Sequence, residues 1–336
     1  MKVLVVGGGG REHALCWKLR QSAELGELYC APGNPGTATI ARNVSVAADE
    51  IQRLADLAAD LKIDLTVVGP ELSLALGIVD EFQERGLRIF GPHQRAAQLE
   101  SSKVFAKEFM ARHQIPTAPF QVVHTAKEAR RAVKEIGLPA VLKADGLAAG
   151  KGVLIVRERS ELRPALDVFF SERRFGGAGD RVVVEACLEG EEVSLIALSD
   201  GRRLLALAPA KDYKRVGVGD QGPNTGGMGS HSPSGVLGSA EAAEVLERVM
   251  WPVIEQMAGE NQPFVGFLYA GLILTQEGPR VLEFNVRLGD PEAQSVLLRL
   301  EDDLLPVRVA GAERRFDLPR LRFRREAAAC VVLASR

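Results

Sequence analysis

Short apolar runs alternate with helical patterns over the first hundred residues. The run Val3–Val6 is unbroken and rich in β-branched side chains, as expected of a parallel strand buried on both faces. From Arg11 to Ser22 the apolar side chains recur at helical spacing instead. Further strand-like runs occupy residues 28–31, 65–69 and 87–91, and helical stretches occupy residues 49–61 and 74–85. This alternation predicts a doubly wound α/β domain with ligands at the carboxyl ends of its strands.

The order of the elements changes after residue 100. Ser101 or Ser102 is a candidate N-cap for a helix that runs to about His113, and turn residues at 276–279 predict a hairpin. Helices are expected over residues 125–136, 161–170 and 240–257, and strands over residues 141–144, 153–156, 182–185, 193–198, 204–208, 269–275, 280–285 and 329–334. This second region is therefore predicted to be α+β, with antiparallel sheets.

The charge balance narrows the classes of partner. The chain has 336 residues, with 42 Lys and Arg against 44 Asp and Glu, so its formal net charge is −2. Since it has no long basic block, we expect neither nucleic acid nor an anionic membrane as a partner. No apolar run approaches the roughly 20 residues that span a bilayer, which favours a cytoplasmic protein. The four cysteines form no C-x-x-C pair, so we expect reduced thiols rather than a zinc site.

Glycine-rich stretches add candidate chemistry, and the first of them covers residues 7–10. Glycine lets backbone amides approach a phosphate, because it has no Cβ and tolerates positive φ. A dinucleotide fingerprint fits poorly here, since Glu12 stands where its third glycine belongs. We favour an anion at the start of a helix, beside Arg11, over a simple tight turn. The strand-end loops 32–37 and 69–71 are expected at the same edge of the sheet.

A second stretch, residues 143–152, combines three glycines with two lysines. It departs from a P-loop, because Gly152 stands where that motif needs Ser or Thr. A glycine flap over nucleotide phosphates, with Lys143 at the end of the strand below, fits better than a hairpin with a solvated lysine. The acidic turn that follows the strand at 182–185 would then offer backbone groups to an adenine and a carboxylate to a ribose.

Glu283, Asn285 and Arg287 alternate with apolar residues, so they share one face of a strand. A carboxylate and an amide oxygen suit Mg²⁺ that bridges nucleotide phosphates, although a plain polar sheet face remains the alternative. Residues 212–215 and a third glycine-rich stretch, 217–229, complete the set. So flexible a loop is costly to order unless a ligand binds there.

Several of these stretches stand in a fixed order between Met1 and about Leu300, namely residues 9–14, 31–34, 68–71, 143–152, 222–229 and 283–292. Together they resemble the phosphoribosylamine–glycine ligase (glycinamide ribonucleotide synthetase) family of ATP-grasp enzymes. The resemblance implies that ATP drives the joining of glycine to 5-phosphoribosylamine through a glycyl phosphate. It also implies Mg²⁺ or Mn²⁺ as a cofactor, and we expect a monomer.

The resemblance further implies roles for single residues. For the chemical step it implies Lys143, Arg287, Asp290 and Asn224. For ATP it implies Lys103, Lys143, Asp145, Gly146, Gly150, Lys151, Gly152, Glu185, Ala186, Leu188 and Glu192. For the other substrates it implies Gly9, Gly10, Arg11, Glu12, Gly33, Asn34, Pro70, Glu71, Asp212, Lys214, Thr225, Gly226 and Gly227. Glu283 and Asn285 match the family's metal ligands.

We expect the chain to be organised in three parts. Residues 1–101 are the N-terminal substrate-binding domain, and residues 102–307 are the ATP-grasp domain with a small lid at about 118–189. Residues 308–336 are expected to be a linker and the first strand of a C-terminal domain that is truncated here. Two other functions stay open, namely another ATP-grasp ligase of carboxylates and amines, and a nucleotide-binding protein without catalysis.

Overall fold

The computed structural model describes residues 1–147, 152–219 and 221–334, and for Pro223 and Asn224 it describes the backbone alone. The N-terminal part is a parallel five-stranded sheet in the order β3-β2-β1-β4-β5. Its strands are β1 (Lys2–Gly7), β2 (Glu27–Pro32), β3 (Arg42–Asn43), β4 (Leu65–Val68) and β5 (Ile89–Phe90). The strand order reverses on either side of the central β1, so the predicted doubly wound domain is confirmed.

The helices of this part are α1 (Gly10–Leu19), α2 (Ile51–Asp60), α3 (Glu71–Ala75) and α4 (Ile78–Glu84). The prediction of one helix over residues 74–85 is wrong, because α3 and α4 are separate. Gly77 has φ +85° between them, a left-handed conformation that glycine adopts without a steric penalty. Glu71 lies in the first turn of α3, shortly after the carboxyl end of β4.

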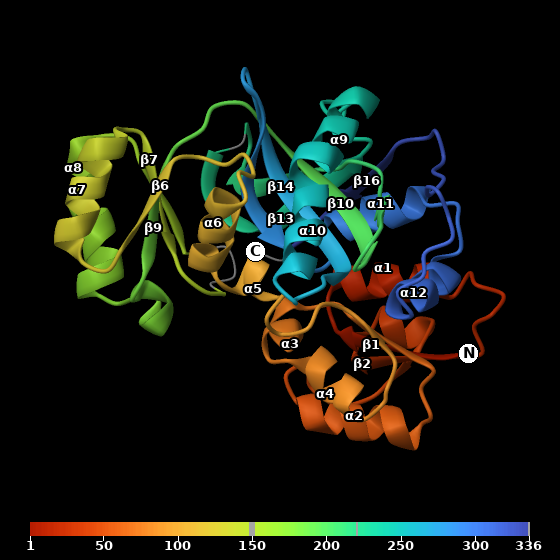
Figure 1. Cartoon of the computed structure of the whole chain (residues 1–336). Helices are drawn as coiled ribbons and strands as arrows, with labels where there is room; N and C mark the ends of the chain where they lie inside the picture. The colour runs from red at the N-terminus through yellow and green to blue at the C-terminus, as the bar shows by residue number, and fades with distance from the viewer. Residues whose placement is uncertain (148–151, 220, 335–336) are drawn as a thin grey trace.

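A second sheet, in the order β6-β9-β7-β8, forms a lobe at the left of Figure 1. Its antiparallel strands are β6 (Phe120–Val123), β7 (Ala140–Ala144), β8 (Val153–Val156) and β9 (Val182–Ala186). Helices α7 (Ala126–Ile136) and α8 (Arg159–Leu166) lie along its outer side. We call residues 120–186 the side lobe. It has its own hydrophobic core, which includes Leu142, Phe169 and Val184.

The body of the molecule is built on an antiparallel sheet in the order β11-β10-β14-β15. Its strands are β10 (Glu191–Asp200), β11 (Leu204–Ala206), β14 (Val265–Thr275) and β15 (Gly278–Asn285). The predicted hairpin is confirmed by the pairing of β14 with β15. The helices of the body are α5 (Gln98–Ser101), α6 (Lys103–Arg112), α9 (Ser239–Val245), α10 (Trp251–Gly259), α11 (Glu292–Arg299) and α12 (Leu304–Ala312).

The expectation that residues 217–229 form a loop is wrong. Most of it belongs to β13 (Gln221–Ser232), which pairs with β12 (Lys211–Gly217) on one side and β16 (Ala328–Val331) on the other. Gly229 explains one glycine of this strand, since a Cβ there would lie 2.6 Å from the carbonyl oxygen of Cys330. The glycine therefore lets β16 approach β13, a need of packing rather than of ligand binding.

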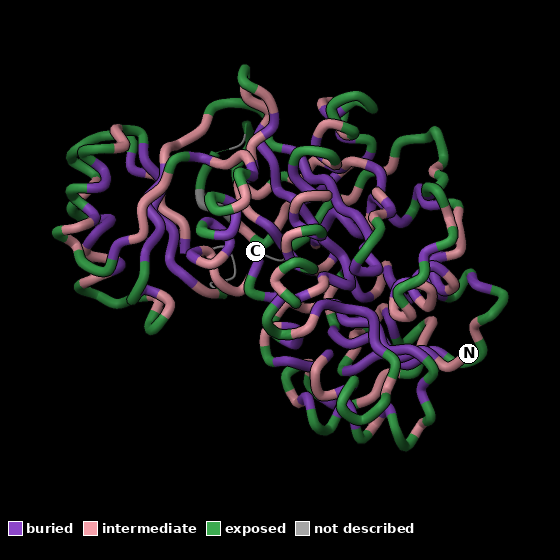
Figure 2. The backbone as a smooth tube through the Cα atoms, viewed as in Figure 1, coloured by how far each residue is buried: buried purple, intermediate pink, exposed green. Residues whose placement is uncertain are grey.

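Two hydrophobic cores each include residues of both the N-terminal sheet and the body. Figure 2 shows buried backbone, in purple, in both of these parts. One core joins Leu4 to Leu268, and the other joins Phe90 to Phe267. Helix α12 contributes to the second core and crosses the expected boundary at residues 307 and 308. The N-terminal sheet and the body are thus packed as one unit. In the parts of the chain described, no helix is long and apolar enough to cross a membrane.

Candidate active site

A buried network of charged side chains lies between the side lobe and β15. Lys143, near the end of β7, places Nζ 2.6 Å from Oε1 of Glu185 on the neighbouring β9. The same ammonium group donates a hydrogen bond of 3.0 Å to the carbonyl oxygen of Leu282. Burial alone would raise the pKa of Glu185, but the charges of Lys143 and Lys107 hold it below its ordinary value.

Lys107 also belongs to this network, and the sequence analysis did not single it out. Its Nζ forms an ion pair with Oε2 of Glu185 and donates to Oγ1 of Thr117 at 2.6 Å. Burial lowers its pKa to about 8. One signal was present in the sequence, because Lys107 follows Lys103 by four residues and so lies on the same face of α6.

Lys103 and Asp145 meet at the N-terminus of α6. Lys103 Nζ donates to the carbonyl oxygen of Gly146 at 3.1 Å, and burial lowers its pKa. The Asp145 carboxylate accepts from the Ser102 hydroxyl at 2.9 Å and lies 2.5 Å from the Arg181 guanidinium. Asp145 therefore anchors the start of α6 in this structure.

The predicted flap is described at its two ends. Gly146 has φ +111°, and the carbonyl oxygen of Gly152 accepts the N–H of Ala144 at 2.8 Å. The predicted residues Gly150 and Lys151 lie outside the described residues, as does the side chain of Asn224.

The predicted adenosine contacts follow the side lobe. The Ala186 N–H donates to the carbonyl oxygen of Pro119 at 3.0 Å, so it is already engaged within the protein. Leu188 is half-buried, and Glu192 at the start of β10 is exposed. The carboxylate of Glu185 is held by two lysines, which leaves Glu192 as the predicted acidic residue that a ribose could reach.

Glu283 and Asn285 lie on one face of β15, as the alternation predicts. Gly271 of β14 lies opposite Glu283, and a Cβ there would come within 3.3 Å of the Glu283 side chain. Burial alone would raise the pKa of Glu283. Three neighbouring ammonium groups lower it instead, those of Lys214, Lys143 and Lys103.

A carboxylate and an amide oxygen surrounded by lysines fit a divalent cation that arrives with a polyphosphate. Within the described residues, no group of three or more His, Cys, Asp or Glu could hold a metal ion without such a partner. Asn285 Oδ1 also accepts from Arg287 at 3.1 Å, so the orientation of the amide is fixed.

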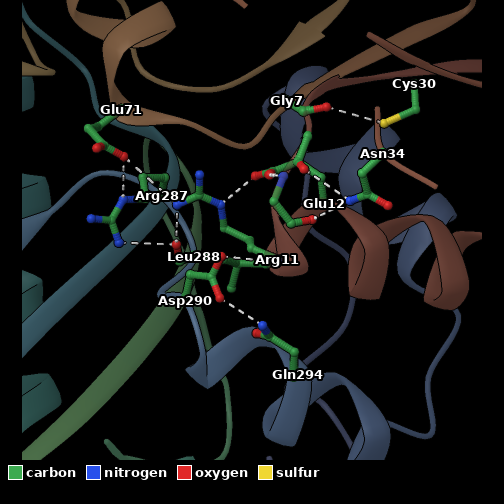
Figure 3. Close-up of polar contacts among 12 residues, drawn as sticks. Gly7, Arg11, Glu12, Cys30, Asn34, Glu71, Arg287, Leu288, Asp290 and Gln294 are labelled. Atoms are coloured by element: carbon green, nitrogen blue, oxygen red, sulfur yellow. Dashed lines mark hydrogen bonds and ion pairs between the residues drawn. The ribbon is translucent and has the colours of Figure 1, made fainter. Parts of the chain in front are cut away.

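Arg287 connects the two halves of the molecule (Figure 3). Its Nε lies 3.2 Å from Glu71 of the N-terminal part, and Arg11 approaches the same carboxylate oxygen at 3.9 Å. Its other side contacts Glu100 at 2.7 Å. Burial opposes the charge on Arg287, but Glu100 and Glu71 raise its pKa above the ordinary value. Glu100, in the short helix α5, carried no recognisable signal in the sequence.

The glycine loop before α1 encloses a carboxylate of the protein. Glu12 accepts the N–H of Gly9 at 2.6 Å, and a Cβ on Gly7 or Gly69 would collide with its side chain. Arg11 stabilises the same carboxylate through a contact of 2.5 Å. Among the glycines predicted to admit a phosphate, Gly7 therefore makes room for Glu12, and Gly9 donates its N–H to the same carboxylate.

Other residues of this edge are brought together as predicted. Asn34 donates to the carbonyl oxygens of Gly8 and Gly9, at 3.0 and 3.1 Å. Asp290 reaches from the body to accept the N–H of Arg11 at 3.2 Å. Gly10 packs so closely on α11 that a Cβ would lie 2.7 Å from Gln294.

The remaining loop residues of this edge have local roles. Gly33 has φ +73° and leaves space for Asn43, while Pro70 is the N-cap residue of α3. Thr225 donates to the carbonyl oxygen of Lys214 at 2.8 Å and accepts the N–H of Gly227. A Cβ added to Gly226 would meet no atom of the described residues within 4 Å.

Lys214 stands between Asp212 and Glu283, at 3.7 and 3.8 Å from their carboxylates. Burial opposes its charge, but Glu283 and Asp212 raise its pKa. Glu292, which is buried, accepts the Tyr269 hydroxyl at 2.6 Å, and burial together with Asp212 raises its pKa. The structure thus brings Asp212 and Lys214 of β12 beside the predicted metal ligands of β15.

Comparison with known proteins places this architecture in one family. The model of the phosphoribosylglycinamide synthetase N domain matches residues 1–100, and that of the ATP-grasp (A) domain of the same enzyme matches residues 101–293. Phosphoribosylamine–glycine ligase of Xanthomonas axonopodis pv. citri is 52% identical over 321 residues, which cover 94% of this chain and 74% of that protein. The enzyme of that name from Caldanaerobacter subterraneus subsp. tengcongensis is 48% identical, covering 100% of this chain and 81% of that protein.

A solved structure supports the same placement. The crystal structure of phosphoribosylamine–glycine ligase from Thermotoga maritima matches with a TM-score of 0.86 and 34% identity, covering 100% of this chain and 81% of that one. Family models, relatives and fold agree over the residues that form the site. The chain therefore belongs to the phosphoribosylglycinamide synthetase family, whose relatives found here are named phosphoribosylamine–glycine ligase.

Proposed function

We propose that this chain joins glycine to 5-phosphoribosylamine at the expense of ATP, giving glycinamide ribonucleotide, ADP and phosphate. The observation that carries the proposal is the group of three lysines, Lys103, Lys143 and Lys214, around the carboxylate of Glu283. Positive charge beside a hard oxygen donor is what a triphosphate with its metal ion requires. The membership of the chain in this family supplies the identity of the two other substrates.

Phosphoryl transfer needs placement and neutralised charge more than it needs an enzyme nucleophile. An oxygen of the glycine carboxylate attacks the γ-phosphorus of ATP, and the bond to the β-phosphate oxygen breaks to release ADP. The amine of 5-phosphoribosylamine then attacks the carbonyl carbon of glycyl phosphate, loses a proton, and phosphate departs. Lys143 and Lys103 would balance the negative charge that moves during the first step.

Glu283 and Asn285 would hold Mg²⁺ or Mn²⁺, which supplies charge neutralisation between the nucleotide phosphates. The nearby ammonium groups disfavour a lone cation, so we propose that the metal binds together with ATP. The role of Asn285 depends on Arg287, which holds its amide in place.

The edge that joins the two halves would receive the other substrates. Arg11 and Arg287 share the half-buried carboxylate of Glu71, so an anionic group of a substrate would find two guanidinium groups there. We place 5-phosphoribosylamine on the side of Arg11, Glu71 and Asn34. We place glycine and the acyl phosphate nearer Arg287 and Asp290.

We further propose that the protein works as a cytoplasmic monomer on small molecules, without nucleic acid or a membrane. Light scattering during size-exclusion chromatography tests the monomer, and a dimer mass would refute that part.

Phosphate release tests the proposed reaction. We expect release only when ATP, glycine and 5-phosphoribosylamine are all present, and we expect the Glu283→Gln variant to lose it while keeping the wild-type Tm. Equal release with other amino acids or amines would favour another carboxylate–amine ligase of this fold. Tight ATP binding without release under any combination would favour a non-catalytic nucleotide-binding protein.

A further inference from the structure

Lys107 belongs to a buried network of contacts that begins and ends on β15. The Thr117 hydroxyl donates to the carbonyl oxygen of Val281 at 2.7 Å and accepts from Lys107. Lys107 pairs with one oxygen of Glu185, and Lys143 pairs with the other. Lys143 Nζ in turn donates a hydrogen bond to the carbonyl oxygen of Leu282 on β15. The network therefore connects α6, β9 and β7 to Val281 and Leu282, the two residues directly before Glu283.

The charges of Lys107, Glu185 and Lys143 do not cancel. Two ammonium groups face one carboxylate, and all three side chains are less than a tenth exposed. Lys107 occupies one oxygen of Glu185, so the carboxylate cannot neutralise Lys143 completely. Without Lys107, Glu185 and Lys143 would form a neutral pair, and the positive charge offered to a phosphate would fall.

We propose that Lys107 is a positioning residue of the ATP site, which holds Glu185 so that Lys143 keeps both its place and its positive charge toward the nucleotide phosphates. This inference rests on the ATP-binding part of the proposed function. Lys107 itself points to Thr117 and Glu185 and lies against the ring of Phe120, 5.8 Å from its centroid. It therefore acts through Lys143 and does not need to touch the substrate.

Titration calorimetry of ATP and of AMP, both with Mg²⁺, distinguishes this role from general support of the fold. In Lys107→Met we expect the affinity for ATP to fall about tenfold at pH 7, because a nearby positive charge is lost. The affinity for AMP should stay within about twofold, because its single phosphate does not reach as far as the γ-position. Lys107→Arg, which keeps the charge, should recover most of the affinity for ATP.

Lys18→Met is a matched control. Lys18 is also a buried lysine, but it lies on α1 and donates to the carbonyl oxygen of Leu300, away from the nucleotide site. We expect this variant to lower Tm without changing the ratio of ATP to AMP affinity. A loss of ATP affinity in Lys18→Met equal to that in Lys107→Met would overturn the inference.

The pH dependence gives a second readout that a purely structural role would not change. The charged groups facing Lys107 are Glu185 on β9, Lys143 on β7 and Glu283 on β15. Since the pKa of Lys107 is about 8, its charge is present below that pH and lost above it. Wild-type affinity for ATP should therefore weaken as the pH rises through 8, and Lys107→Met should lack this step.

The outcomes separate the inference from the proposed reaction. If wild-type protein releases no phosphate with glycine and 5-phosphoribosylamine, the proposed reaction fails, while the contrast between ATP and AMP still tests Lys107. If Lys107→Met folds with unchanged ATP affinity, or loses ATP and AMP equally, the inference is wrong. Should Lys107→Met fail to fold, Thr117→Val removes the hydroxyl that holds Lys107, and it should weaken ATP binding selectively in the same direction.

Discussion

Glu185 lies between two lysines at the centre of the proposed nucleotide site. It is buried, yet its pKa is held low, because ammonium groups from α6 and β7 contact its two oxygens. A sequence motif predicts the residues that face a ligand, and it predicted Lys143 and Glu283. It could not identify Lys107 and Glu100, because their roles come from partners 78 and 187 positions away in the chain.

The low pKa of Glu185 predicts how stability depends on pH. A carboxylate whose pKa is depressed by folding stabilises the native state above its ordinary pKa and loses that contribution as the pH falls. At pH 7 we expect Glu185→Gln to lower the free energy of unfolding by about 3–5 kcal/mol, because it leaves two buried lysines without their anion. The difference from wild type should shrink as the pH falls below the ordinary pKa of a glutamate, about 4.3, toward the lower pKa of the native carboxylate.

Urea unfolding at several pH values measures this difference. Glu81→Gln is the control, since Glu81 pairs with Arg85 on the helix surface and should change stability by less than about 0.5 kcal/mol. A Glu185→Gln penalty that is as small as the control at pH 7, or that grows toward acid pH, would contradict the prediction.

Strand β13 is one of the elements that the sequence did not reveal. Strands β1, β2, β4 and β5 of the N-terminal sheet were predictable from short apolar runs, whereas β3 is the polar pair Arg42–Asn43. In β13 the glycines suggest a flexible loop when only local preference is considered. Its strand conformation depends on neighbours from distant parts of the chain, β12 on one side and β16 on the other.

Gly229→Ala tests the tertiary reason for a glycine in this strand. The new methyl group would lie 2.6 Å from the carbonyl oxygen of Cys330, so β16 must move or detach. We expect a loss of about 1–3 kcal/mol in the free energy of unfolding and faster amide exchange in β16. Gly226→Ala is the control, because a Cβ there meets no described atom within 4 Å, and it should change stability far less. Equal effects of the two substitutions would show that backbone approach is not the reason.

At the scale of the whole molecule, the side lobe differs from the rest in how it is held. It has a hydrophobic core of its own, whereas the N-terminal sheet and the body share two. The buried ion pair of Lys107 with Glu185 is a charged link between the lobe and the body. Regions with separate cores can open without disrupting the remainder of the fold.

We therefore expect amides of β7 and β9 to exchange with solvent through openings of lower free energy than those of the central strand β1. ATP with Mg²⁺ should slow exchange in the side lobe, because the ligand would contact Lys143 at its edge. Hydrogen exchange read by mass spectrometry measures both effects, with β1 as the internal reference. If ATP slows exchange equally in β1, or leaves the side lobe unchanged, the two parts do not behave separately.

The ring of Phe90 packs edge-on against Phe267 at 5.5 Å, and the guanidinium of Arg308 lies over both. These three residues come from the N-terminal sheet, β14 and α12. Their contacts therefore extend across the point near residue 100 where the two family models meet. A fragment cut at that point would expose aromatic surface on both pieces. Anyone exchanging halves between relatives would consequently have to carry this aromatic and arginine contact across the junction as a set.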